Sequence, residues 1–89
     1  MFKITGNKGF QITFENGNTI SVQFGRGNYC SNYNVLNTAD AECENAEVAI
    51  WNDAGVWYTF DDTSRVKWHC TPDIVAGLIQ KAKNGELDF

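Results

Sequence analysis

The sequence predicts an α+β fold: an antiparallel β-sheet of five or six strands, built from two β-hairpins plus edge strands, with one C-terminal helix packed on one face. Two segments that alternate apolar and polar residues around a glycine-containing turn predict the hairpins. A capped segment with apolar residues at helical spacing predicts the helix. Because 89 residues provide one modest core, residues 1–89 are expected to form a single domain.

A short first strand is predicted from Phe2 to Thr5, followed by a turn over residues 6–9. The next segment predicts a hairpin with its loop at residues 15–17. The pairs that this loop predicts are Phe14 with Asn18, Ile12 with Ile20, and Phe10 with Val22. The apolar residues then share a core face, and a solvated face carries Gln11, Thr13, Glu15, Thr19, Ser21 and Gln23.

The second hairpin is predicted down to its register. A three-residue loop from Asp53 to Gly55 keeps the apolar residues of both arms on consistent faces, whereas a two-residue loop would mix the faces. The pairs that follow are Asn52 with Val56, Trp51 with Trp57, Ile50 with Tyr58, and Val48 with Phe60.

The last strand and the helix complete the predicted fold. A strand is expected from Arg65 to Cys70, with Val66, Trp68 and Cys70 on one face and Arg65, Lys67 and His69 on the other. Thr71 is a good N-cap, Pro72 suits the first helical position, and Gly85 ends the helix. The apolar stripe predicted to dock it consists of Ile74, Val75, Leu78, Ile79 and Ala82.

The net charge of −4 is unevenly distributed. Residues 36–62 contain seven acidic residues and no Lys or Arg. Such a segment repels nucleic acid and membrane surfaces and attracts a basic surface. The alternative is a solvated face that keeps a small protein soluble.

The three cysteines, Cys30, Cys43 and Cys70, form no CxxC pair. They are expected to be reduced, unlinked and free of metal, although His69 allows a Cys3His zinc site to be written. No cofactor is predicted. The first residues lack the apolar stretch of a secretory signal, so a soluble, cytoplasmic protein is the expectation.

No catalytic motif is present, and the protein is not expected to be an enzyme. On a strand, His69 and Cys70 point to opposite faces, so the histidine cannot activate the adjacent thiol. Asp61 and Asp62 precede Thr63 and Ser64, which is typical of a turn and not of a spaced acid and base pair.

Aromatic residues are the better candidates for a binding site. Trp51 and Trp57 face each other across the second hairpin, which matches the composition of interface hot spots unless the helix or the long loop covers them. The long loop after Phe24 is a further candidate. Its rigid aromatic and adaptable polar groups come from Arg26, Tyr29 and Tyr33.

The compact hairpins, the loop sequence NYCSNYN and the segment WNDAGVWYTFDD resemble short open reading frames of bacteriophage and prophage genomes. The resemblance covers most of the chain. Proteins of this kind include inhibitors of host defence, such as anti-CRISPR proteins and signal-molecule sponges, which act by binding. The resemblance therefore implies a binding role in the cytoplasm of a host cell and transfers no functional residue.

Two hypotheses follow. The first is a phage-encoded inhibitor that binds a basic host protein through Trp51, Trp57, Glu42, Glu44 and Glu47. Its oligomeric state is left open between a monomer and a homodimer. The second is a homo-oligomeric binder of a small anionic, nucleotide-like ligand, held by Arg26, Tyr29, Tyr33, Arg65 and Lys67.

Overall fold

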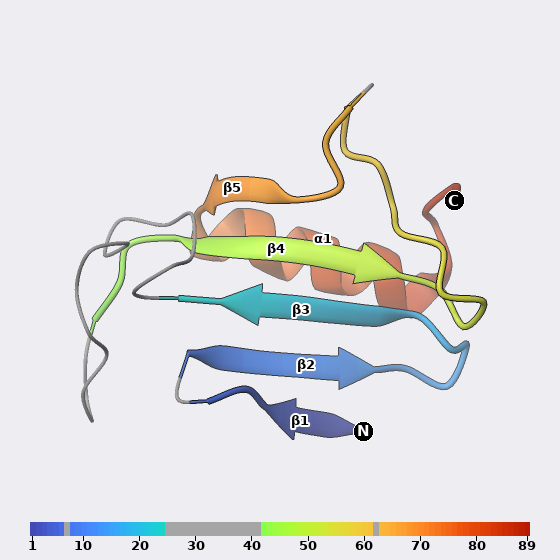
Figure 1. The fold of residues 1–89 in the computed structure, drawn as a ribbon, viewed down its shortest axis with the longest axis horizontal. Coiled ribbons are helices and arrows are strands. Elements are labelled where there is room, and N and C mark those ends of the chain that lie inside the picture. The colour runs from blue at the N-terminus through green and yellow to red at the C-terminus, as the bar shows by residue number, and fades with distance from the viewer. Residues whose placement is uncertain (7, 25–41, 62) are drawn as a thin grey trace.

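The computed structural model describes residues 1–6, 8–24, 42–61 and 63–89. Within them the chain forms an antiparallel sheet of five strands in sequential order with one helix packed on one face, which confirms the predicted α+β fold (Figure 1). The elements are β1 (Phe2–Ile4), β2 (Gly9–Thr13), β3 (Thr19–Gln23), β4 (Ala46–Trp51), β5 (Lys67–Cys70) and α1 (Pro72–Asn84).

The first predicted hairpin has the predicted register. Phe10 pairs with Val22 and Ile12 with Ile20, and the N–H of Phe14 donates to the carbonyl of Asn18 at 2.9 Å. The strict alternation of apolar residues determined this register, because a shift by one residue would expose them all.

The second hairpin is confirmed at its turn but not along its length. Trp51 bridges to Trp57, and the N–H of Tyr58 donates to the carbonyl of Ile50 at 2.7 Å. The predicted pair of Val48 with Phe60 is wrong, because Val48 pairs with Lys67 of β5.

The chain leaves the hairpin because Asp61 forms a tight turn. Its Oδ1 accepts the backbone N–H groups of Thr63 at 2.9 Å and Ser64 at 2.7 Å. Phe60 then donates its N–H to the carbonyl of Ser64 at 2.8 Å instead of joining the sheet. The returning chain, as β5, takes the place beside β4.

β5 begins later than predicted and does not keep the predicted alternation. Ala46 pairs with Cys70 and Val48 with Lys67, so β5 has one extra residue between these pairs, which defines a bulge. His69 adopts φ 52° within it. As a result Cys70 is buried whereas Trp68 is 55% exposed, although both were predicted on one face.

Capping residues delimit α1 as predicted. Thr71 Oγ1 accepts the N–H of Ile74 at 3.3 Å, and Pro72 opens the helix. At the other end two hairpin side chains contact the last carbonyls: Asn18 Nδ2 donates to Ala82 O at 3.0 Å, and Asn16 Nδ2 donates to Ala82 O at 2.9 Å. The β2–β3 turn therefore holds the C-terminal end of the helix against the sheet.

The core lies between α1 and strands β3, β4 and β5. Its buried members are Ile20, Val22, Ala46, Val48, Ile50, Cys70 and Ala82. The predicted stripe of α1 packs here with one exception, since Ile74 is 41% exposed. With 3.6 residues per turn, Ile74 lies about 80° around the helix from the buried Ala82, at the margin of the stripe.

The far face, defined as the sheet face opposite α1, is less solvated than predicted. Thr19, Ser21 and Ala49 are buried there. They are small residues on the two central strands, and larger side chains of neighbouring positions, such as Trp51 beside Thr19, flank them. The hydroxyl groups of Thr13 and Thr19 lie 2.8 Å apart, so a hydrogen bond between them offsets the loss of water.

Candidate functional site

Trp51 and Trp57 form a stacked pair at the end of β4. Their ring centroids lie 5.1 Å apart with an angle of 26° between the planes. Trp51 is half-buried and Trp57 is 41% exposed. The half-buried Trp51 ring therefore stacks against the Trp57 ring, which solvent can reach.

The turn that follows β4 positions this pair. Asn52 donates its backbone N–H to Val56 O at 2.9 Å, and its Oδ1 accepts the N–H groups of Ala54 at 3.0 Å and Val56 at 2.9 Å. Gly55 adopts φ 79°, a left-handed conformation that other residues rarely accept. These bonds fix the backbone on both sides of the pair.

The pair lies on the far face. Trp51 pairs with Thr19, whereas the preceding residue, Ile50, pairs with Ile20 in the core under α1. The sequence left open whether the helix or the long loop buries the two tryptophans. The helix does not bury them, because it packs on the other face of the sheet. The long loop at residues 25–41 lies outside the described residues.

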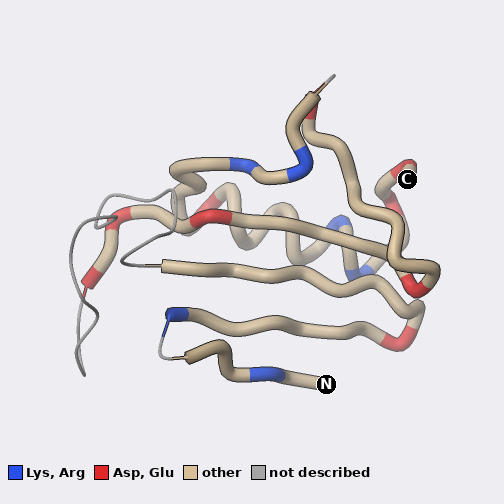
Figure 2. The backbone as a smooth tube through the Cα atoms, in the orientation of Figure 1, with Lys and Arg blue, Asp and Glu red and all other residues tan. Residues whose placement is uncertain are grey.

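The three acidic residues of the first hypothesis do not lie beside the tryptophans, and Figure 2 shows acidic residues toward both ends of β4. Glu47 shares the far face with Trp51 but precedes it by four residues, about 13 Å along a strand. Glu42 and Glu44 are exposed in the segment that leads into β4, at the other end of that strand. The predicted site residues therefore divide into an aromatic end and an acidic end of β4.

Two further acids lie at the aromatic end. Asp53 and Glu15 belong to the two hairpin turns and are both exposed. The turns are adjacent, since a Cβ placed on Gly17 would lie 2.6 Å from Cβ of Asp53. The two turns are far apart in the chain and come together through the pairing of β3 with β4, which no local pattern predicts.

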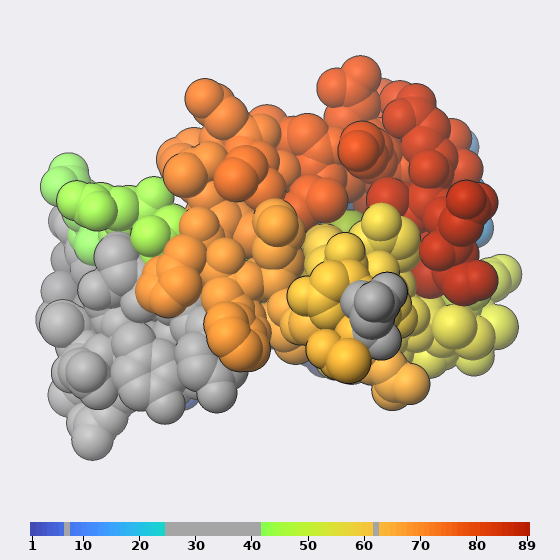
Figure 3. Space-filling view, turned by 90° about the horizontal axis from the view of Figure 1, so that it is seen from above, coloured from blue at the N-terminus to red at the C-terminus, as the bar shows by residue number. Residues whose placement is uncertain are grey.

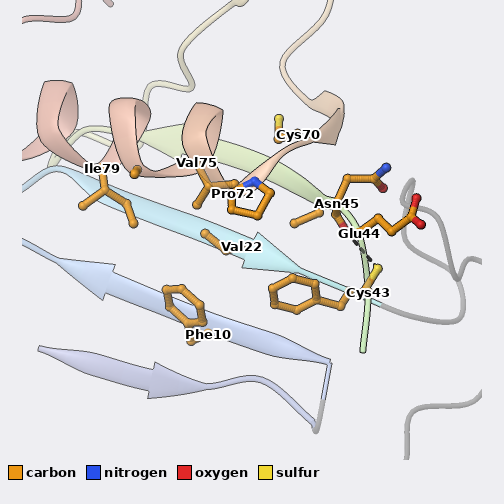
Figure 4. A pocket seen from close by; sticks show the side chains of 12 residues that line it. Phe10, Val22, Cys43, Glu44, Asn45, Cys70, Pro72, Val75 and Ile79 are labelled. Atoms are coloured by element: carbon orange, nitrogen blue, oxygen red, sulfur yellow. Dashed lines mark hydrogen bonds between the residues drawn. The ribbon is translucent and has the colours of Figure 1, made fainter. Parts of the chain in front are cut away.

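An apolar pocket of about 280 Å³ lies on the other side of the sheet, between α1 and β2–β3 (Figure 4). Pro72, Val75 and Ile79 form its helical wall, and Phe10 and Val22 form its floor. The pocket was not predicted, because the sequence places Phe10 and Val22 on the core face and Val75 and Ile79 on the helix stripe that packs against it. Their alternation predicts the face on which they lie but not the lateral position of the helix above them.

Two cysteines line this pocket, and both are free thiols. Cys43 Sγ donates to Asn45 O at 2.8 Å, and Cys70 Sγ lies 3.6 Å from Lys67 O. Burial raises the pKa of the Cys70 thiol, and the positive charge of Lys67 partly opposes the rise. Cys70 is therefore protonated and a poor nucleophile at neutral pH.

The zinc site considered from the sequence has no counterpart in the described part of the chain. Residues 1–6, 8–24, 42–61 and 63–89 contain no group of three His, Cys, Asp or Glu side chains able to hold a metal ion. His69 Nδ1 instead lies 3.4 Å from Asn45 Oδ1. Cys30 lies outside the described residues.

The ligand-binding set of the second hypothesis is described only in part. Arg26, Tyr29 and Tyr33 lie outside the described residues. Arg65 is exposed, and Lys67 lines a hollow of about 560 Å³ with mixed polar and apolar walls, formed by the 60–68 segment that Figure 3 shows in yellow and orange.

This hollow is poorly suited to an anion. Asp61 lines it together with Lys67. Hydrogen bonds from the backbone N–H groups of Thr63 and Ser64 lower the pKa of the Asp61 carboxyl, so it stays ionised. Its negative charge opposes the attraction that Lys67 offers to a phosphate group.

Comparison of the chain with family models, curated proteins and solved structures gave no match. In the described residues, no helix is both long and apolar enough to cross a membrane.

Proposed function

We propose that this chain is a small, non-enzymatic protein-binding module whose contact surface is centred on Trp51 and Trp57. The observation that carries the proposal is the stacked pair, with Trp57 41% exposed on the sheet face that α1 leaves uncovered. Tryptophan is the residue type most enriched at the energetic centres of protein interfaces.

The pair is prepared for binding because it is already ordered. The bridge between Trp51 and Trp57 and the Asn52 turn hold both rings before any partner arrives. An ordered ring loses less side-chain entropy on association than a freely rotating one. Most of the area that Trp57 exposes is therefore available to stabilise a complex.

Charge supports a basic partner. Glu42, Glu44 and Glu47 lie at one end of β4, Asp53 and Glu15 lie at the other, and residues 36–62 contain no Lys or Arg. Acidic residues beside the tryptophan pair and at the other end of β4 would accelerate association with a positively charged surface. The resemblance to phage reading frames favours a host protein, and specifically a defence protein, as that partner.

The test is a capture experiment from bacterial lysate with wild-type protein and single tryptophan variants, followed by binding kinetics on the captured partner. Trp57→Ala is expected to remain folded and to weaken binding by about 2 kcal/mol, through faster dissociation. Trp68→Ala is the matched control, because Trp68 is 55% exposed but lies on β5. It should bind as wild type.

Charge reversal separates the electrostatic contribution. Glu42→Lys, Glu44→Lys and Glu47→Lys combined should slow association and reduce its dependence on salt, with a small effect on dissociation. Asp88→Lys, on the exposed C-terminal segment, is the control for each single Glu→Lys variant, because both change the net charge by +2. A partner that binds Trp57→Ala and wild type equally would overturn the proposal.

A further inference from the structure

β1 is an outer strand of the sheet, and no described strand pairs with its other edge (Figure 1). Two backbone hydrogen bonds of 2.8 Å join Met1 and Thr13, each residue donating its nitrogen to the carbonyl oxygen of the other. The N–H of Thr5 donates to Gly9 O at 3.0 Å. Because bonding alternates along an antiparallel ladder, Phe2 and Ile4 direct their N–H and C=O groups away from β2. The edge thus offers two donors and two acceptors.

The same two residues expose large apolar side chains. Phe2 is 77% exposed and Ile4 is 81% exposed. They pair with Ile12 and Phe10, so they lie on the sheet face that carries α1.

The helix does not extend over them. Five strands spaced about 4.8 Å apart are roughly 19 Å across, whereas a helix with its side chains is about 10 Å wide. α1 packs against β3, β4 and β5, so this helix does not cover the β1 side of the face. A free edge and an apolar surface therefore coincide at β1.

We propose that a second copy of this chain occupies this edge, with the two β1 strands antiparallel about a two-fold axis at Lys3. Phe2 then pairs with Ile4 of the second copy, and Ile4 with Phe2 of the second copy, which forms four backbone hydrogen bonds. Among the residues of β1, the registers that pair Phe2 with Phe2 or Ile4 with Ile4 each form two. The two sheets become one continuous sheet, and the four apolar side chains meet on its helical face.

The edge is suited to a second copy because it is self-complementary. Its outward groups and its apolar side chains are placed symmetrically about Lys3, as a two-fold axis requires. Met1, Phe2 and Ile4 each offer on the order of 100 to 200 Å² of apolar surface, so two copies would bury roughly 600 to 1,200 Å². That area is at the lower limit for a specific interface and implies a weak, reversible dimer.

Lys3 limits the affinity. Its side chain lies on the far face, since it pairs with Gln11, and the two-fold axis places it opposite Lys3 of the second copy. Like charges directly opposite each other destabilise a strand pair. Lys3→Thr is therefore expected to tighten the dimer about two- to five-fold, and raising the salt concentration should also tighten it.

Sedimentation equilibrium over a wide concentration range tests the proposal, with protein that carries no N-terminal tag. Wild type should show a reversible monomer–dimer equilibrium with a dissociation constant on the order of micromolar to hundreds of micromolar. Ile4→Glu should be monomeric at every concentration. Ile74→Glu is the matched control, because Ile74 is 41% exposed but lies on α1, and it should dimerise as wild type.

Two outcomes would overturn the proposal: a wild-type protein that stays monomeric up to millimolar concentration, or a dimer that Ile4→Glu leaves intact. The proposal is independent of the tryptophan surface. Trp57→Ala is expected to dimerise as wild type, so failure of the partner-binding proposal and failure of the dimer are separate results.

Discussion

Ile50→Ala is expected to destabilise the domain by about 3 to 4 kcal/mol. Ile50 is fully buried on β4, pairs with Ile20 on β3 and belongs to the cluster that α1 covers. Removing three carbon atoms leaves a cavity that the surrounding sheet cannot close. In a domain of this size such a loss is a large share of the total stability.

Urea unfolding measures this loss, and Ile74→Ala supplies the matched control. Ile74 is 41% exposed on α1, so the same truncation should cost less than about 1 kcal/mol. Equal losses at the two positions would contradict the assignment of Ile50 to the core and Ile74 to its margin.

Gly9→Ala is expected to destabilise the domain by about 3 kcal/mol or more. Gly9 opens β2 with φ 157°, and a Cβ there would collide with the carbonyl oxygen of Val22 and approach Gln23 Cα to 2.9 Å. Both contacts are with backbone, so no change of rotamer relieves them. The first pair of the β2–β3 ladder would have to open.

Gly77→Ala is the control, and its effect should have the opposite sign. Gly77 lies within α1, and a Cβ there would meet nothing within 4 Å. Because alanine loses less backbone entropy in a helix, this variant should be more stable by about 0.5 to 1 kcal/mol. Thermal unfolding of both variants compares them directly, and an unchanged melting temperature for Gly9→Ala would contradict the described β2–β3 pairing.

The sequence predicted those parts of the fold that depend on local periodicity. The registers of both hairpin turns and the two ends of α1 follow from alternation, turn residues and caps, and these act over a few neighbouring positions. The contact of Asn16 and Asn18 with the end of α1 was not predictable, because it joins segments more than 60 residues apart.

The prediction was wrong where side-chain hydrogen bonds compete with the ladder. Asp61 accepts hydrogen bonds from the N–H groups of Thr63 and Ser64, and the turn that results prevents Phe60 from pairing with β4. The bulge in β5 likewise separates Trp68 from Cys70. Alternation alone cannot reveal an inserted residue.

The candidate site, like the fold, was predictable from the sequence only in part. The pairing of Trp51 with Trp57 follows from the turn, and it is confirmed. The clustering of acids was inferred from closeness in sequence, but an extended strand separates Glu47 from Trp51 by about 13 Å. The exposure of Phe2 and Ile4 depends on the lateral position of α1, which no local pattern specifies.

Hydrogen exchange of the complex with its captured partner shows whether the Trp51 and Trp57 pair forms the contact surface. We expect slower exchange on binding in peptides that cover residues 49–58 and the adjacent 13–19 turn, and unchanged exchange in α1. Protection confined to α1 or β1, with none around the tryptophan pair, would contradict it.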